Sequence, residues 1–362
     1  MKVCHFTSAH KSDDIRIFVK ECSSLASAGF DVYLVAQGVD REENGVHVIG
    51  VGEMPENRKN RMTKFVKKVY FKALDIDADI YHFHDPELLP YGLKLKKMGK
   101  KVIFDSHEDV PAQILDKTWI PLLLRRIISE VYKTYETFVV RKLDVVITAT
   151  EHIASAFENR AKKILVINNY PKLDDIVFHD TPFLERAMQI CYAGGLNNIR
   201  GQRVMVEATI DTDAKLVIAG PCDDDYIQTT KGNFTYLGLI SRGQVNELYG
   251  NSRMGILLYQ PARNHFESQP IKMFEYMAAG LPFVASDFPL WKNIAEGNGC
   301  GLCVDPRNKE AVKEACNFII RNPQKAEEMR KNGRKAVLEK YNWAIEEKKL
   351  KKLYMQMGGN LK

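Results

Sequence analysis

The chain has 362 residues, of which 45% are apolar and 27% charged, and its net charge is +6. This length is too great for one ordinary hydrophobic core and suits two domains. No apolar run reaches the roughly 18 residues of a membrane span, and the polar start MKVCHFTSAHKSDD is unlike a secretory signal, so we expect neither. Seven scattered cysteines favour a reducing compartment over a disulfide framework.

The excess positive charge is local. The segment 58–72, RKNRMTKFVKKVYFK, contains no acidic residue. No nucleic-acid-binding motif accompanies it, so we expect no nucleic-acid partner. An anionic membrane surface is a better partner, and an ordinary solvated helix face is an equally good interpretation. The sequence therefore predicts a cytoplasmic protein. If segment 58–72 binds an anionic membrane surface, the protein would be peripheral on the inner face of the cytoplasmic membrane.

Short β-branched runs alternate with amphipathic helices along residues 1–172, the predicted first domain. A helix is expected from Ile15 to Ala28, with Gly29 ending it. Near-continuous apolar strands with helical crossovers predict a parallel sheet covered on both faces. The predicted strands are 2–8, 31–36, 46–51, 79–84, 101–106, 144–149 and 164–169.

The alternation lapses at 170–187, where we expect a hinge, and restarts in a second domain at 185–340. The fold class is therefore α/β, with two doubly wound Rossmann-like domains whose ligand site would lie in the cleft between them. Residues 341–362 are expected to form a last helix. The predicted strands of the second domain are 188–195, 215–220, 234–238, 254–260, 282–287 and 301–305.

A lysine stands where a helix begins in the stretch ESQPIKMFEYMAAG (267–280). Pro270 suits the first helical position, which places Lys272 in the first turn, where the helix dipole disfavours a cation by about 0.3–1 kcal/mol. A bound phosphate would explain the position, and an ion pair with Glu275 would explain it equally well. The loop residue Glu267 could face hydroxyls of a sugar.

A second cation stands before another helix, in CYAGGLNNIRGQRVMVEA (191–208). Gly194 and Gly195 allow close approach of a ligand to the backbone, and Arg200 offers a planar fork for phosphate oxygens. Two cationic helix entrances in one domain would match the charge of a diphosphate without a metal ion. Glu275, one turn further on, could accept hydrogen bonds from a ribose diol.

Polar residues also follow strands of the first domain. His10, Asp13 and Arg16 come after the first strand and His107 after 101–106, so we expect them near the cleft as substrate contacts. Asp13 or the adjacent aspartate could equally cap the next helix. His82 and His84 share a strand face and Asp85 follows them, so these three could hold a metal, but no fourth ligand is evident and no metal is expected.

The sequence resembles the retaining glycosyltransferases of the GT-B fold, family 4. Glu267 and Glu275 fit the E-x7-E spacing of that family, EYMAAGLPFVASDFP its helix–glycine–strand sequel, and YAGGLNNIRG its diphosphate loop. TSAHKSDDIRIFVKECSSLASAGFDVYLVA (7–36), DADIYHFHDPELLP (77–90) and KVIFDSHEDVP (101–111) fit its first domain. The resemblance covers nearly the whole chain.

The resemblance implies transfer of a sugar from a nucleotide-diphosphate donor to an acceptor hydroxyl, with retention and without a metal or other cofactor. Catalytic roles are implied for four residues: His107, Glu267, Arg200 and Lys272. The implied donor-binding residues are Gly194, Gly195, Arg200, Ser268, Gln269, Lys272 and Glu275. The implied acceptor-binding residues are His10, Asp13, Arg16 and His84. The last helix would cross back to the first domain.

Three points stay open at this stage. The chain has Glu267-Ser268-Gln269-Pro270 where the family commonly has E-G-F-G, so either Glu267 or its two neighbours could face the transferred sugar. The acceptor could be a lipid-linked or growing surface glycan, such as a capsule or cell-envelope polysaccharide. A nucleotide-sugar epimerase of the same fold, and a non-catalytic nucleotide-sugar-binding partner subunit, are the alternative functions.

Overall fold

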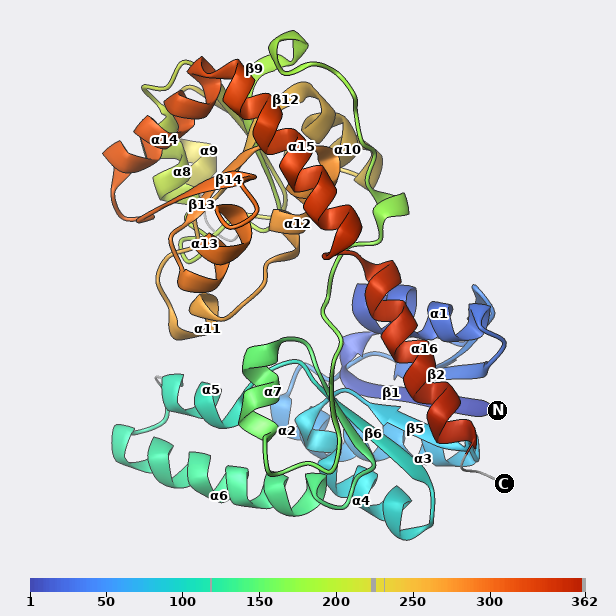
Figure 1. The fold of residues 1–362 in the computed structure, drawn as a ribbon. Coiled ribbons are helices and arrows are strands. Elements are labelled where there is room, and N and C mark those ends of the chain that lie inside the picture. Colours follow the sequence, from blue (N-terminus) through green and yellow to red (C-terminus); the bar gives the residue numbers. More distant parts are fainter. Residues whose placement is uncertain (118, 223–225, 231, 360–362) are drawn as a thin grey trace. The chain divides into compact units, whose positions relative to one another are not determined.

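The computed structural model describes residues 1–117, 119–222, 226–230 and 232–359, and it divides into two compact units (Figure 1). The N-terminal unit comprises Met1–Asn169 with Ala344–Lys362, and the C-terminal unit comprises Tyr170–Trp343. The last three residues of the predicted segment 341–362 lie outside the described residues.

An eight-stranded sheet forms the centre of the N-terminal unit, in the order β3-β4-β2-β1-β5-β6-β7-β8. Neighbouring strands are parallel except β3 and β4, which are antiparallel. The strands are β1 (Lys2–Lys11), β2 (Asp31–Gln37), β3 (Arg41–Glu43), β4 (Val46–Gly50), β5 (Ile80–Phe83), β6 (Lys101–Ser106), β7 (Val145–Thr148) and β8 (Ile164–Val166). Every residue of β5 and β7 is buried, as expected for strands covered on both faces.

Helices cover this sheet. They are α1 (Ser23–Ser27), α2 (Arg58–Asn60), α3 (Val66–Asp75), α4 (Leu89–Lys97), α5 (Val110–Asp116), α6 (Leu122–Val140) and α7 (Glu151–Phe157). Two π-helical segments, η1 (Ile15–Cys22) and η2 (Arg61–Phe65), and a 3₁₀ turn, η3 (Pro86–Leu88), precede helices α1, α3 and α4. The predicted helix from Ile15 thus opens as a π-helix, and it ends as expected before Gly29, whose φ is 86°.

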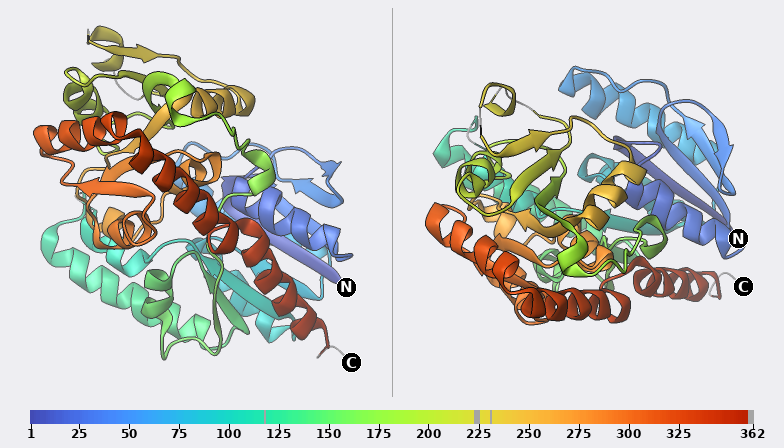
Figure 2. Two further views of the ribbon diagram at one scale, coloured as in Figure 1. Left: turned by 45° about the horizontal axis from the view of Figure 1, so that its top comes forward. Right: turned by 90° about the horizontal axis from the view of Figure 1, so that it is seen from above.

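The final helix, α16 (Trp343–Gly359), belongs to the N-terminal unit from Ala344 onward. It follows α15 (Pro323–Glu339) as a separate helix at the red end of the chain (Figure 2). The Glu346 carboxylate accepts the backbone N–H of Asn168 at 3.1 Å, and the Tyr354 hydroxyl contacts buried histidines of β1 and β5. Polar contacts therefore tie both ends of α16 to this unit.

The C-terminal unit has a six-stranded parallel sheet in the order β11-β10-β9-β12-β13-β14. Its strand order reverses between β9 and β12, which is where ligands bind in doubly wound sheets. The strands are β9 (Ala187–Ala193), β10 (Lys215–Ala219), β11 (Phe234–Tyr236), β12 (Ser252–Leu257), β13 (Phe283–Ser286) and β14 (Gly301–Val304). Its further helices are α8 (Gln202–Thr209), α9 (Tyr226–Thr229), α10 (Arg242–Asn251), α11 (Arg263–Phe266), α12 (Ile271–Ala279), α13 (Pro289–Ala295) and α14 (Lys309–Arg321), with 3₁₀ turns η4 (Leu173–Asp175) and η5 (Phe183–Glu185).

The predicted strands are all present, and the two α/β sheets confirm the predicted fold class. The short strand β3 was not predicted, because REE carries no apolar alternation. One local prediction is wrong: Pro270 is the N-cap of α12, with φ −67° and ψ 125°, rather than its first helical residue. The prediction that Lys272 lies in the first turn of that helix is correct.

Candidate active site

Two cationic side chains of the C-terminal unit meet at the glycine turn that follows β9. A β-carbon built on Gly194 would collide with Cε and Nζ of Lys272, and one built on Gly195 would collide with the guanidinium of Arg200. The side chains of Lys272 and Arg200 therefore pack against the backbone of two adjacent glycines in one turn. The prediction placed both side chains near this turn, and the structure brings them together there.

The position of Lys272 follows from the start of α12. The helix begins at Ile271, so the ammonium lies at a helix N-terminus, 5.6 Å from the centroid of the Tyr192 ring. Burial lowers the pKa of Lys272, the charge of Glu275 opposes that shift, and the nearby Arg200 lowers the pKa further. No carboxylate among the described residues forms an ion pair with Lys272. A partly buried cation beside another cation at a positive helix end is a site for an anion.

The loop before α8 holds Arg200 in place. The Asn197 side chain accepts the backbone N–H of Arg200 at 2.9 Å. Gly201 then caps α8 with φ 77°, and any β-carbon there would strike the carbonyl oxygen of Leu258, which follows β12. The backbone N–H of Gln260 donates to the carbonyl of Ile199 at 2.8 Å. The loops after β9 and β12 are thus tied together at the switch point.

Glu275 does not pair with Lys272. Its Oε1 accepts from Arg242 at 2.8 Å and its Oε2 accepts from the Tyr249 hydroxyl at 3.1 Å. The carboxylate is 13% exposed, so it reaches the surface while held by two donors from α10. This excludes the ion pair as the explanation of the Lys272 position in this structure.

The segment before α12 presents three of the predicted residues. Glu267 is exposed at the C-cap of α11. The carbonyl of Ser268 accepts from Nε1 of Trp291 at 2.7 Å, which fixes the loop against α13. Gln269 has a buried side-chain oxygen with no hydrogen-bond partner among the described residues. An amide oxygen without a partner is a candidate contact for a ligand donor.

In the N-terminal unit, His10 and His107 lie side by side, with ring centroids 5.3 Å apart. Nε2 of His107 contacts Oδ2 of Asp105 at 3.0 Å, and Nδ1 of His10 contacts Oδ2 of Asp14 at 3.3 Å. Burial alone would lower the pKa of His10, but the bond to Asp14 and nearby carboxylates raise it. Both rings are partly exposed, so they can reach a substrate.

The other predicted residues of this unit are placed differently. Arg16 is 5% exposed and His84 3% exposed. Arg16 donates two hydrogen bonds to Asp105, at 3.1 and 3.0 Å, and a third to the Ile167 carbonyl at 2.8 Å. Because both side chains are buried in this structure, a substrate could not contact them directly. Asp13 is exposed and lines a pocket of about 440 Å³ with Ser12 and Arg41, while Asp14 caps η1.

Comparison with known proteins identifies the family of this chain. Residues 177–336 match the family model described as Glycosyl transferases group 1, and residues 18–170 match the one described as Glycosyltransferase Family 4. The chain is a glycosyltransferase. The D-rhamnosyltransferase WbpZ of Pseudomonas aeruginosa is 21% identical to it over 359 residues, which cover 92% of this chain and 90% of WbpZ. An uncharacterized glycosyltransferase of Methanocaldococcus jannaschii is 24% identical over 377 residues, covering 93% and 94% of the two chains.

Solved structures place the glycosyltransferase in a known fold. Sucrose-phosphate synthase of Thermosynechococcus elongatus matches with a TM-score of 0.76 and 16% identity, over 99% of this chain and 100% of that one. WaaG, a glycosyltransferase involved in lipopolysaccharide biosynthesis, matches with a TM-score of 0.68 and 13% identity, over 96% and 98%. At such identities the likeness shows the fold alone, and it confirms GT-B.

Sequence reasoning missed several residues that shape these sites. The ring of Tyr192 lies beside Lys272, and Arg242 and Tyr249 donate hydrogen bonds to Glu275. Single tyrosines and arginines belong to no sequence motif, so nothing indicated these contacts. A buried group in the N-terminal unit was also missed: His5, Glu21, Asp105 and Tyr354 surround His82 and His84. One signal was available, because charged residues at 16, 20 and 21 interrupt the apolar face of a helix.

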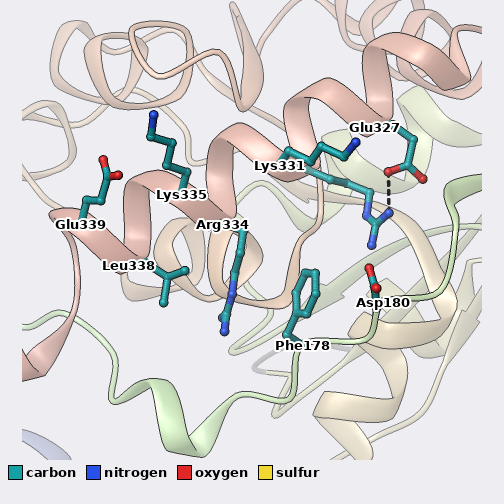
Figure 3. Close-up of a pocket in the computed structure, with 9 residues that line it drawn as sticks. Phe178, Asp180, Glu327, Lys331, Arg334, Lys335, Leu338 and Glu339 are labelled. Atoms are coloured by element: carbon teal, nitrogen blue, oxygen red, sulfur yellow. Dashed lines mark hydrogen bonds and ion pairs between the residues drawn. The ribbon is translucent and has the colours of Figure 1, made fainter.

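A further pocket of the glycosyltransferase takes in none of the predicted residues. It measures about 350 Å³ and is lined mainly by α15 and the segment before η5 (Figure 3). Arg334 lies beside Phe178 there, with its guanidinium carbon 4.9 Å from the ring centroid, and Glu327 pairs with Arg330 at 2.6 Å. Its two arginines thus already have partners. Among the described residues, no helix combines the length and apolar character that a membrane crossing requires.

Proposed function

We propose that this glycosyltransferase transfers a sugar from a nucleotide-diphosphate donor to an acceptor hydroxyl, with retention of configuration and without a metal ion in the transfer. One observation carries the proposal: Arg200 and Lys272 meet over the Gly194–Gly195 turn at the switch point of the C-terminal sheet. The HepE structures of Anabaena, which share the fold at a TM-score of 0.73, contain UDP with glucose or UDP-glucose. A diphosphate is therefore the anion that we place between the two cations.

The chemistry needs charge stabilisation where the donor breaks. As the bond between the anomeric carbon and the diphosphate oxygen cleaves, negative charge grows on the diphosphate. Arg200 and Lys272, already fixed at the turn, would stabilise that charge without reorganising, which is the efficient form of electrostatic catalysis. The acceptor oxygen bonds to the anomeric carbon, and its proton passes to the departing diphosphate. Glu267, Ser268 and Gln269 would contact the transferred sugar.

The rest of the donor and the acceptor have candidate contacts as well. We assign the ribose diol to Glu275, whose carboxylate is held at the surface by Arg242 and Tyr249. In the N-terminal unit we assign polar contacts to His10, Asp13 and His107, which are exposed or partly exposed. Arg16 and His84 would act on these through Asp105, since both side chains are covered.

The acceptor that we favour is lipid-linked, at an anionic membrane surface on the cytoplasmic side. Helix α6 exposes apolar side chains along its length, with Leu123 84%, Ile127 60% and Val131 65% exposed. The acid-free segment 58–72 adjoins it, because the Arg58 guanidinium lies 5.6 Å from the ring of Trp119, itself 67% exposed. Apolar side chains rimmed by cations suit the interface of an anionic bilayer.

The deciding experiment measures binding and transfer with matched variants. A thermal-shift screen of UDP-, GDP-, ADP- and dTDP-sugars identifies the donor, since a ligand at 100 times its Kd adds about 2.7 kcal/mol to the free energy of unfolding. Arg200→Ala and Lys272→Ala should each lower transfer at least about 100-fold, as loss of an oxyanion donor does. Lys215→Ala removes an exposed lysine of the same unit and should change nothing.

Other outcomes would point to other functions. Interconversion of the donor sugar in the absence of any acceptor would indicate a nucleotide-sugar epimerase. Tight donor binding with no turnover across a broad acceptor panel would indicate a non-catalytic partner subunit. Wild-type transfer rates in both Arg200→Ala and Lys272→Ala would remove the physical basis of the proposed diphosphate site.

A further inference from the structure

A group of ionisable side chains lies in the interior of the N-terminal unit, away from solvent. His5, Glu21 and His82 are fully buried, and His84 is 3% exposed. We call these four residues the histidine cluster. One potential ligand atom from each lies within 4.8 Å of the others. Three imidazoles and a carboxylate are a donor set typical of zinc sites.

The sheet register produces the cluster. His5 of β1 and His82 of β5 are Cα partners in the parallel ladder, so their side chains lie next to each other on one face of the sheet. His84, two residues further along, points to the same face. Glu21 comes from η1, where hydrogen bonds span five residues rather than four, and Arg16 Nε lies 3.2 Å from its Oε1.

Two separations between candidate ligand atoms, which involve three side chains, are near those found around a zinc ion. Nδ1 of His5 is 3.1 Å from Nε2 of His84 and 3.9 Å from Oε2 of Glu21. Ligand atoms around a tetrahedral zinc ion lie roughly 3.3 Å apart, given bonds of about 2.0–2.1 Å. Nε2 of His82 remains as the fourth donor, because the Nδ1 of that ring is bonded to Tyr354.

The outward nitrogen of each ring faces an oxygen atom. Nε2 of His5 and Nδ1 of His82 contact the Tyr354 hydroxyl at 3.0 and 2.7 Å. Nδ1 of His84 lies 3.3 Å from Oδ2 of Asp105. Metal-bound histidines usually direct their second N–H to such an oxygen, which fixes the tautomer. Two of these outer contacts, both to Tyr354, are hydrogen bonds, whereas Nδ1 of His84 approaches Asp105 without hydrogen-bond geometry.

An ion would satisfy lone pairs of the histidine cluster that have no hydrogen-bond donor. A neutral imidazole has one N–H and one lone pair. Without an ion, His5 and His84 can share one inward hydrogen bond, but Nε2 of His82 and Nδ1 of His84 have no hydrogen-bond partner among the described residues. The Glu21 carboxylate has no hydrogen bond there either, and only its ion-pair contact with Arg16 faces its charge. With an ion, all three rings would carry their hydrogen outward, and the inward lone pairs and the carboxylate would be ligated.

We propose that the histidine cluster binds one Zn²⁺ ion, with His5 Nδ1, His82 Nε2, His84 Nε2 and a Glu21 oxygen as ligands. The ion would fasten β1, β5 and η1 together and, through Tyr354, hold α16 to the unit. Its role is structural and separate from the proposed diphosphate site. The sequence did not predict it, because the added ligands, His5 and Glu21, come from β1 and η1, far in the chain from His82 and His84.

Two neighbouring groups bear on this choice. Arg16 contacts Glu21, so its guanidinium would lie next to the ion. That guanidinium donates to both oxygens of Asp105, and the carboxylates of Glu21 and Asp105 offset the positive charge of the ion and the arginine. His84, Asp105 and His107 form a second possible set of ligands. We favour the first set, since Arg16 already occupies the carboxylate of Asp105.

The test uses untagged full-length protein, freed of metal with a chelator and titrated with Zn²⁺ and with Co²⁺. We expect about one ion per chain, a tetrahedral Co²⁺ absorption band and a higher melting temperature, because an ion that binds only the folded chain stabilises it. Tyr354→Phe should weaken Zn²⁺ binding about 10- to 100-fold as an outer contact, and Glu21→Gln and His82→Ala should weaken it further.

The control separates this site from surface binding. His47→Ala removes a partly exposed histidine beside Asp31 and Glu42 and should leave the titration unchanged. Circular dichroism of the metal-free variants checks that each is folded, and Glu21→Gln preserves the side-chain shape. Absence of a tight ion in the folded wild-type protein, or equal binding by wild type and Glu21→Gln, would overturn the proposal.

Discussion

The ammonium arm of Lys272 occupies the space above Gly194 where any other residue would carry its β-carbon. The two residues come from different segments, one from the turn after β9 and the other from the first turn of α12. Their contact means that a methyl group at position 194 must displace the lysine. The glycine is thus required by the cation rather than by the backbone turn alone.

We therefore predict that Gly194→Ala lowers sugar transfer about as much as Lys272→Ala, at least about 100-fold, by moving the ammonium from the diphosphate. Gly243→Ala is the matched control, because only the Ser241 hydroxyl lies near its new methyl group, at 3.9 Å, and alanine is favourable inside α10. Donor titration and initial rates report the effect. Full activity in Gly194→Ala would mean that the lysine position is not critical.

Glu275 provides a separate prediction for the nucleotide end of the donor. If its carboxylate accepts the ribose hydroxyls, Glu275→Ala should weaken donor binding about 10- to 150-fold, which corresponds to about 1.5–3 kcal/mol for hydrogen bonds to a charged group. Glu247→Ala, which removes an exposed glutamate of α10, should have no effect. Isothermal titration with the donor identified by the thermal-shift screen measures both, and equal affinities would contradict the ribose assignment.

The fold and the diphosphate-binding part of the candidate site could be predicted from the sequence for a physical reason. Strand and helix periods, glycines and helix-start residues are local signals, so β9, the glycine turn and the first turn of α12 could be read directly. The meeting of Arg200 with Lys272 was expected because strand ends of a parallel sheet share an edge. The partners of Glu275 could not be foreseen, since Arg242 and Tyr249 depend on how α10 packs against α12.

The N-terminal unit shows the opposite case. His10 and His107 were expected near each other and are, but Arg16 and His84 turned out to be buried. Exposure depends on what covers a strand end, and the cover here includes η1 and α16. Tyr354 of α16 contacts His5 at a separation of 349 residues. No local pattern could have indicated that contact.

The exposed face of α6 predicts membrane binding that can be measured on vesicles. Leu123→Asp together with Ile127→Asp should reduce cosedimentation with anionic vesicles by tenfold or more, because burying each apolar side chain contributes about 1.5–3 kcal/mol. Leu184→Asp, at an apolar site 63% exposed in the C-terminal unit, is the control. Binding should also fall with added salt, and a double variant that binds like wild type would contradict a role for α6.

The contact between His10 and Asp14 predicts a pH-dependent stability. The pKa of His10 is raised above 6.5, because the bond to Asp14 and the charges of nearby carboxylates together outweigh burial, which acts in the opposite direction. Hydrogen bonds lower the pKa of Asp14 below 3.8 against the effect of its burial. The raised histidine contributes stability that is present below pH 6.5 and lost as the pH rises through its folded pKa. The lowered aspartate contributes stability that is present above pH 3.8 and lost as the pH falls through its folded pKa.

Asp14→Asn keeps an N-cap side chain on η1 and removes only the charge. It should lower the pKa of His10 in an NMR titration and reduce the free energy of unfolding by about 1 kcal/mol near pH 5, with a smaller loss near pH 9. Asp13→Asn, at the adjacent exposed position, should change neither quantity as much. Denaturant unfolding at the two pH values decides the matter, because a uniform loss across pH would show that the cap, rather than the ion pair, accounts for the effect of Asp14.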